Sequence, residues 1–206
     1  MSTVKKFSYS VHPAIAMAQS SAQKLFERTG LTIDEWVERV RNDGPPLEKA
    51  RRDWLKNAHG ITTNYAGWIA ERADGRGAED TDPDAYLAAA DRYVESMYGG
   101  AKAGLRPLYE RLLELCFSLG NDVKACPCQT MVPLYRKHVF AQIKPSTRTR
   151  IDFGLALKDT PAVLPLIDTG GFAKKDRITH RIPLSSADEI GSELRKWLRI
   201  AYEMDA

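Results

Sequence analysis

The chain has 206 residues, of which 43% are hydrophobic and 28% charged, with 30 Lys and Arg against 27 Asp and Glu. This globular composition excludes a disordered or fibrous chain, and no stretch approaches the roughly 20 apolar residues of a membrane span. The three cysteines are too few and too close together for a disulfide framework, and no apolar segment follows the N-terminal lysines as a secretion signal requires. We therefore expect a reduced, cytoplasmic protein with no membrane contact.

The N-terminal part of the chain has the periodicity of amphipathic helices. Thr32 and Glu35 form the capping-box pattern that opens one of them, and Gly60 marks the end of another. The apolar stripes predict four helices that share a core, around residues 15–26, 33–40, 47–59 and 64–73.

A polar, glycine-containing stretch, Asp74–Asp82, is the strongest candidate for a linker. Asp82-Pro83 then has the pattern of an N-cap followed by proline at the first helical position. Helical periodicity continues after it, in two segments that end near residues 97 and 119. We therefore expect an all-helical domain over residues 1–77 and a second domain over residues 82–206.

After residue 121 the spacing of apolar residues changes from the helical period to the period of two that strands have. Three half-buried strands are predicted, over residues 138–144, 148–157 and 177–184, the first two joined by a connection of hairpin length. Ser186 and Glu189 form a second capping-box pattern, which opens a last helix. The predicted fold class is α+β, with an all-helical N-terminal domain followed by a small antiparallel sheet packed by helices.

Charge is distributed unevenly along the chain, although the formal net charge is only +3. Residues 121–184 contain 11 Lys and Arg against 5 Asp and Glu, a net charge of +6, and the rest of the chain has a net charge of −3. A clustered positive field attracts polyanions. The same cations would also suit the solvated face of an ordinary sheet, so both interpretations stay open.

The most specific expectation places cations on the polar face of the predicted sheet. Arg148 and Arg150 are two residues apart on one strand, so they are expected to point the same way. Guanidinium groups bind phosphate through paired hydrogen bonds, and lysine binds it as a point charge. The loop Thr169–Lys175 combines glycines with lysines, a combination that suits an anion but is also that of a mobile loop. The predicted nucleic-acid or anion-binding residues are Lys144, Arg148, Arg150, Lys174, Lys175, Arg177 and Arg181.

Three other motifs have competing interpretations. Cys126-Pro127-Cys128 brings two thiols together, but no second pair follows at zinc spacing, which favours buried structural cysteines over a metal site. Residues 51–73 have the pattern of a helix-turn-helix, or of two packed helices with a short turn. Asp168-Thr169-Gly170 matches an aspartic-protease signature, a chemistry that needs a second such aspartate, and the chain contains no other copy of the tripeptide.

Two stretches of the sequence resemble catalogued families. The first resembles a small helical bacterial family, domain of unknown function 4287, at Ser10–Pro13, Thr29-Gly30, Glu35-Trp36, Trp54–Lys56, His59–Ile61 and Asn64–Ala66. The second resembles domain of unknown function 5655, at Val132–Tyr135, Val139–Ile143, Arg150–Asp152, Ile182–Leu184 and Trp197. Members that resemble the second family occur beside restriction-nuclease-like domains, which implies nucleic acid by association. Neither resemblance implies catalytic residues.

Taken together, these patterns favour a non-enzymatic, cytoplasmic binding module whose basic sheet face engages a polyanion, nucleic acid above all, by neutralising phosphates. Only Phe140 and Tyr135 offer an aromatic surface there, so base reading is expected to be slight. The alternative is an enzyme or small-anion-binding protein with a cleft near Asp152, His180 and the Gly170-Gly171 loop. A third interpretation is a protein partner bound by the helical domain. No catalytic residue, metal or cofactor is assigned.

Overall fold

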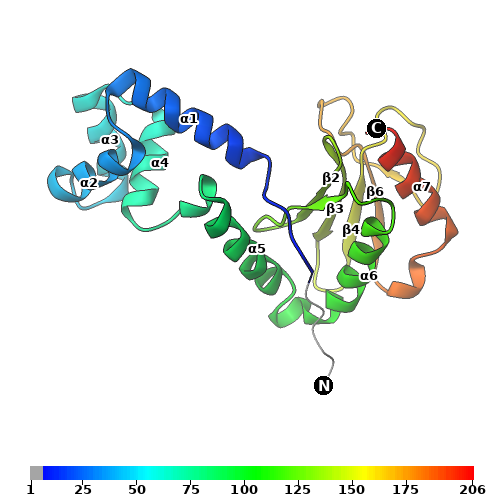
Figure 1. Ribbon diagram of the computed structural model, residues 1–206. Helices are drawn as coiled ribbons and strands as arrows, with labels where there is room; N and C mark the ends of the chain where they lie inside the picture. Colours follow the sequence, from blue (N-terminus) through cyan, green and yellow to red (C-terminus); the bar gives the residue numbers. More distant parts are fainter. Residues whose placement is uncertain (1–6) are drawn as a thin grey trace. The chain divides into compact units, whose positions relative to one another are not determined.

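The computed structural model describes residues 7–206, and these form two compact units, each with its own hydrophobic core (Figure 1). Residues 11–87 form the helical unit, and residues 7–10 with 88–206 form the sheet unit. No helix in the described part of the chain is both long and apolar enough to cross a membrane.

The helical unit contains the four helices expected from the sequence, namely α1 (Ala14–Thr29), α2 (Ile33–Asp43), α3 (Glu48–His59) and α4 (Thr63–Ala73). The predicted capping box is present, because the Thr32 hydroxyl accepts the Glu35 N–H (3.2 Å) and the Glu35 carboxylate accepts the Thr32 N–H (2.7 Å). Gly60 ends α3 with a φ of 66°, which glycine adopts without steric cost. The centre of the core is formed by Leu25, Trp36, Val40, Leu55 and Ile69.

The polar stretch after α4 packs on the helical unit. It contains the short 3-10 helix η1 (Ala78–Asp80). The Gln19 amide donates to the Thr81 carbonyl (2.8 Å), and the Arg72 guanidinium bonds the Thr81 hydroxyl. The helical unit continues to residue 87, within α5 (Pro83–Met97). The division expected between residues 77 and 82 therefore falls just before the boundary of the two units.

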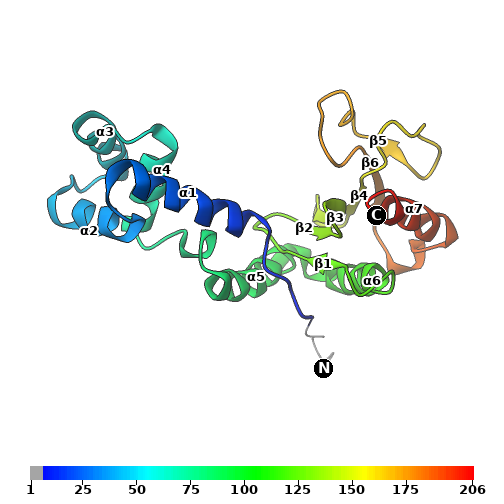
Figure 2. The same cartoon turned by 45° about the horizontal axis from the view of Figure 1, so that its top comes forward.

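The sheet unit confirms the α+β fold class, with a six-stranded antiparallel sheet and helices packed on it (Figures 1 and 2). The strand order is β1-β2-β3-β4-β6-β5. Before the sheet come η2 (Gly100–Leu105) and α6 (Arg106–Phe117), and after it come η3 (Ala187–Glu189) and α7 (Ser192–Glu203). The strands are β1 (Lys124–Ala125), β2 (Val132–Tyr135), β3 (Val139–Pro145), β4 (Ile151–Leu155), β5 (Ile167–Asp168) and β6 (His180–Leu184).

Alternation along the central strands separates two faces of the sheet. Ile143, Phe153 and Ile182 are partners across β3, β4 and β6, and they pack with Leu112 of α6 and Leu198 of α7 in one core. Successive side chains of a strand point to opposite sides, so the intervening residues face away from these helices. We call this opposite side the outer face; its residues on the three central strands are Gln142, Lys144, Asp152, Gly154, Arg181 and Pro183.

Three predicted boundaries are wrong. The strand expected from residue 148 begins at Ile151. Arg148 lies in the turn after β3 and Arg150 directly precedes β4, so the two arginines do not lie on one strand as expected. The strand expected from residue 177 begins at His180. The Ser186 hydroxyl accepts the Asp188 N–H (3.2 Å) and caps η3, and the last helix begins only at residue 192. Alternation that runs on into a loop cannot show where strand pairing starts.

Candidate anion-binding sites

The cations predicted to bind an anion lie in two groups at different ends of the sheet. Lys144, Arg148 and Arg150 lie where β3 ends and β4 begins. Arg177 lies near the start of β3, where its Nε donates to the Val139 carbonyl (3.0 Å). Val139 and Lys144 are separated by about 17 Å, because a strand rises about 3.4 Å per residue. The seven residues therefore do not form one continuous basic patch.

In the first group, two arginines on the outer face share one carboxylate. Arg150 Nε and Arg181 Nη1 lie 3.0 Å and 2.8 Å from the same oxygen, Asp152 Oδ1. The Asp152 side chain is only 17% exposed, so the two ion pairs are partly shielded from water. Lys144 lies opposite Asp152 in the register of β3 and β4 and has no ion pair among the described residues. We call Lys144, Arg150, Asp152 and Arg181 the outer-face cluster, which has three cations for one carboxylate.

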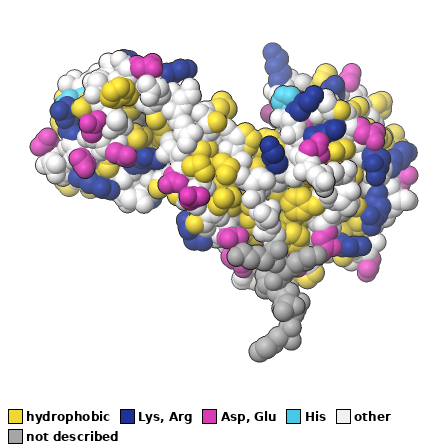
Figure 3. All heavy atoms as spheres, in the orientation of Figure 1, with side chains coloured by type: hydrophobic (Ala, Val, Ile, Leu, Met, Phe, Trp, Pro, Cys, Tyr) yellow, Lys and Arg dark blue, Asp and Glu magenta, His cyan; other side chains and the backbone are white. Residues whose placement is uncertain are grey.

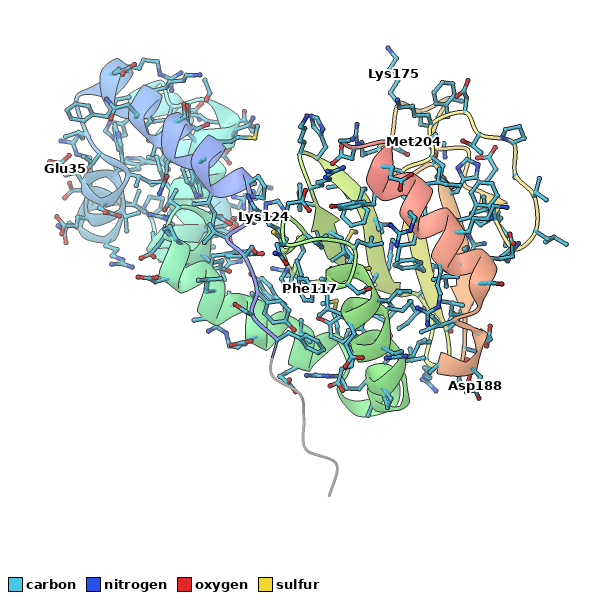
Figure 4. The ribbon with its side chains drawn as sticks, turned by 45° about the vertical axis from the view of Figure 1, so that its right-hand side comes forward. Glu35, Phe117, Lys124, Lys175, Asp188 and Met204 are labelled. Atoms are coloured by element: carbon cyan, nitrogen blue, oxygen red, sulfur yellow. The ribbon has the colours of Figure 1, made fainter. Side chains whose placement is uncertain are left out.

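The second group surrounds a pocket of about 540 Å³ at the end of the sheet where the chain terminates. The loops after β4 and β5 and the C-terminal end of α7 line it. Figure 4 shows Lys175 and Met204 at this end of the unit and Asp188 at the other. We call it the end pocket; its charged residues are Lys158, Lys175, Asp176, Arg177 and Asp205, and its most exposed apolar residues are Phe172 and Met204.

A buried carboxylate holds one side of the end pocket in place. Asp205 is 4% exposed and accepts the His138 backbone N–H (2.7 Å). Its Oδ1 lies 3.0 Å from His138 Nδ1 and also accepts a hydrogen bond from the Arg177 guanidinium. These bonds join the end of α7 to the turn before β3 and to the loop before β6. Asp205 therefore positions Arg177 at the pocket wall.

The two lysines of the end pocket have backbone conformations that lysine rarely adopts. Lys158 (φ 53°) and Lys175 (φ 61°) are the only non-glycine residues with positive φ within residues 7–206. The Lys175 N–H donates to the Phe172 carbonyl (3.0 Å) and the Asp176 N–H to the Gly171 carbonyl (2.8 Å). Those are the two bonds of a Schellman turn, which favours glycine where Lys175 stands. The left-handed conformation costs a residue with a Cβ about 1–2 kcal/mol.

The glycine loop before Lys175 uses its own backbone donors. The Gly170 N–H donates to the Asp168 carboxylate (2.7 Å), and the Gly171 N–H donates to the Thr169 hydroxyl (3.2 Å). A Cβ on Gly171 would lie 2.5 Å from the Ile178 carbonyl oxygen, so only glycine fits there. These bonds shape the loop and leave neither N–H free for an anion. The protease-like tripeptide Asp168–Gly170 is part of this turn.

The residues of the alternative cleft do not converge. Asp152 lies on the outer face, whereas His180 faces the core and is 2% exposed. The His180 Nδ1 lies 2.8 Å from the Thr179 hydroxyl, which in turn accepts the Leu157 N–H (3.1 Å). His180 is therefore tied to its own strand and cannot share a ligand with Asp152.

The cations of the helix-turn-helix pattern are paired within the helical unit. Arg51 forms an ion pair with Asp74. Arg52 lies 2.8 Å from a Glu71 oxygen, and Lys56 lies 2.9 Å from an Asp53 oxygen. Each positive charge near the turn is thus matched by a carboxylate, which gives little net attraction for a phosphate backbone.

Of the two neighbouring thiols, Cys126 is buried and Cys128 is half-buried, and both are protonated at neutral pH. Burial raises the pKa of Cys126 to about 12, with a smaller contribution from Cys128. Burial also raises the pKa of Cys128. Within the described residues, no group of three or more His, Cys, Asp and Glu side chains could hold a metal ion.

We expect the native Cys126 thiol to react very slowly with Ellman's reagent at pH 8. Thiolate is the reacting form, and a pKa of about 12 for Cys126 lowers its population there by roughly a thousandfold relative to a free cysteine. The reaction should accelerate only as the pH approaches 12 or when guanidinium unfolds the chain. A thiol that reacts equally fast before and after unfolding would contradict this prediction.

The structure also shows a basic stripe that the charge count along the sequence missed. Arg195, Lys196 and Arg199 are exposed on α7. Figure 3 shows Lys and Arg side chains gathered along the edge of the sheet unit where α7 lies. The segment of high net charge ends at residue 184, but cations spaced one and four residues apart on a helix would have been a usable signal. Asp205 had no such signal, because only its packing makes it important.

Two family models match the chain. Residues 94–205 match Domain of unknown function (DUF5655), and residues 18–75 match Domain of unknown function (DUF4287). Both resemblances noted in the sequence are thereby confirmed. No curated protein and no solved structure matches the chain. The first match includes both the outer-face cluster and the end pocket.

Proposed function

This chain belongs to the DUF5655 family, whose function is unknown, and we propose that its sheet unit binds a polyanion, nucleic acid, through the outer face of the sheet. The outer-face cluster carries the proposal. Arg150 and Arg181 converge on one Asp152 oxygen, with Lys144 on the neighbouring strand. A phosphate bound beside Asp152 would meet three cations on adjacent strands.

The ion pairs with Asp152 orient both arginines without using all their donors. A guanidinium has five N–H groups. Arg181 donates a hydrogen bond to the Asp152 oxygen through Nη1 (2.8 Å), and Arg150 Nε lies 3.0 Å from the same oxygen as an ion pair without a hydrogen bond. The remaining donors can bind phosphate oxygens, and because the side chains are already held, less conformational entropy is lost on binding. Arg148, exposed in the adjacent turn, extends the positive surface.

The same face offers little for reading bases. Phe140, one of the two aromatic residues expected to stack with bases, is fully buried in the core. Contacts to phosphates position a nucleic acid but carry no sequence information. Binding should therefore be insensitive to sequence and strongly dependent on salt.

The test is fluorescence anisotropy with labelled single-stranded and double-stranded DNA and RNA over a salt series. The Arg150→Gln, Arg181→Gln double variant should bind at least about tenfold more weakly at 50 mM salt, with a salt slope lower by roughly 0.7–0.9 per lost phosphate contact. Asp152→Asn should bind several-fold more tightly, because it removes a negative charge that repels phosphate without changing side-chain size, and this gain exceeds the loss of orientation of the two guanidinium groups. Because the double variant and Asp152→Asn should change the affinity in opposite directions, a general loss of folding cannot explain both results.

The controls remove one positive and one negative charge at positions away from the outer face. Arg111→Gln acts on α6, where Arg111 pairs with Glu114, and Glu193→Gln acts on the exposed side of α7. Both should leave the affinity within about twofold of wild type. Wild-type affinity in the double variant would refute the outer-face model. A loss confined to Arg195→Gln, Arg199→Gln would assign the polyanion to the α7 stripe instead.

Two further expectations remain predictions. We expect a cytoplasmic location, because a reducing compartment suits a protein with free thiols at Cys116, Cys126 and Cys128. The helical unit is the candidate surface for a protein partner, because the apolar Leu47 side chain is 71% exposed on it. A pull-down in which the Leu47→Ser variant lost a partner that the wild-type chain captures would support this interpretation.

A further inference from the structure

We propose that the end pocket is a binding site for a small organic anion, a phosphate monoester that carries an apolar or aromatic group. This site is separate from the outer-face cluster, and the proposal does not depend on nucleic-acid binding. It rests on the charge, the backbone conformation and the apolar walls of the pocket.

The pocket contains positive charge that the protein leaves unneutralised. Lys158 and Lys175 have no ion pair among the described side chains, whereas Arg177 is held by Asp205. Asp176 also lines the pocket and has no cation within ion-pair distance in the described part of the chain. The three cations exceed the two carboxylates by one charge, and one carboxylate is already bound by Arg177 and His138. The excess suits a ligand with one or two negative charges rather than a polyanion.

The backbone conformation indicates that lysine is retained here for its side chain. Both residues occupy left-handed positions that glycine or asparagine would occupy with less strain. Strained backbone of this kind is concentrated at ligand-binding positions, where a particular side chain is required. That the only two such residues within residues 7–206 are lysines lining one pocket points to a shared anionic ligand.

The walls of the pocket suit the uncharged part of the ligand. Phe172 and Met204 are 55% and 42% exposed beside the cations, so both side chains are accessible to an apolar group. Aromatic rings stack on such residues, and thioether sulfur makes favourable contacts with ring edges. A volume of about 540 Å³ is in the range of pockets that bind small molecules. Figure 4 shows the Lys175 side chain pointing outward from its loop, and its flexible four-carbon stem can turn toward a phosphate bound in the pocket.

Calorimetric titration with phenyl phosphate tests the proposal. Inorganic phosphate, which lacks the ring, and benzyl alcohol, which lacks the charge, are the control ligands. Phenyl phosphate should bind the wild-type chain at least about tenfold more tightly than either. Lys158→Asn and Lys175→Asn should each raise the Kd at least about tenfold, because a charged hydrogen bond is lost. Their melting temperatures should equal or exceed that of wild type, since asparagine tolerates the left-handed conformation better.

Variants that remove positive charge outside the end pocket serve as controls. Lys24→Gln, on the exposed side of α1, removes the same charge and should not change the Kd. The Arg150→Gln, Arg181→Gln variant should retain phenyl phosphate binding, which separates this site from the outer face. Equal affinities for phenyl phosphate and inorganic phosphate, or wild-type affinity in Lys158→Asn, would overturn the proposal. So would a loss in Lys174→Asn as large as in Lys175→Asn, because it would indicate diffuse loop charge.

Discussion

Replacing Phe153 with alanine is expected to lower the free energy of unfolding of the sheet unit by about 3–5 kcal/mol. Phe153 is fully buried in the central strand β4, and its strand partners Ile143 and Ile182 are fully and nearly fully buried. Truncation removes most of a ring and leaves a cavity that the paired strands cannot close, because their hydrogen bonds fix the spacing between them. Native-state hydrogen exchange of β3 and β4 amides measures this loss in the unit concerned.

A neighbouring exposed residue provides the control. Thr149 lies in the turn before β4, and Thr149→Ala should change the free energy of unfolding by no more than about 0.5 kcal/mol. A loss below about 1 kcal/mol in Phe153→Ala would mean that β4 is not at the centre of the core.

Asp205→Ala is the second substitution with a large expected effect, a loss of about 2–3 kcal/mol in unfolding free energy. The change removes the acceptor of the His138 N–H and the charged partner of Arg177. Hydrogen bonds to charged groups each contribute about 1.5–3 kcal/mol. Because Arg177 is 47% exposed, water recovers part of its interaction, and the loss stays below that of a fully buried ion pair.

Glu203→Ala is the matched control for Asp205→Ala. Glu203 is the exposed last residue of α7, two residues before Asp205, and it has no ion pair within the described residues. Urea unfolding should show near wild-type stability for this control. Equal losses of unfolding free energy in the two variants would mean that fraying of α7, and not the loss of the buried carboxylate, lowers the stability.

The fold was predictable from the sequence where the signal is local. Helix periodicity, the Thr32–Glu35 capping box and Gly60 depend on residues within a few positions of one another, and the structure contains all three. The short strands β1, β2 and β5 were not predicted, because two to four residues do not show a period. The late start of α7 has a similar cause, since Ser186 caps a 3-10 turn that has the same pattern as a helix start.

The candidate sites were predictable only in part. Charge counting found the basic segment and alternation correctly placed Lys144 and Arg181 on the outer face. Neither signal showed that Asp152 pairs with Arg150 and Arg181, because a cross-strand ion pair depends on the register of the strands. Lys158 appeared in the sequence as one cation among many, and its left-handed backbone gave no sequence signal.

The sequence by itself determined the two apolar periods, the separation of charge and the two family resemblances, because each is a property of nearby residues or of their composition. Only the tertiary structure decided which cations share a ligand-sized space. Lys158, Arg177 and Asp205 meet because β4 and β6 pair and α7 packs on the sheet, contacts between residues far apart in the chain. That pairing divided one basic segment into an outer face and a pocket, since the length of β3 keeps its two ends apart.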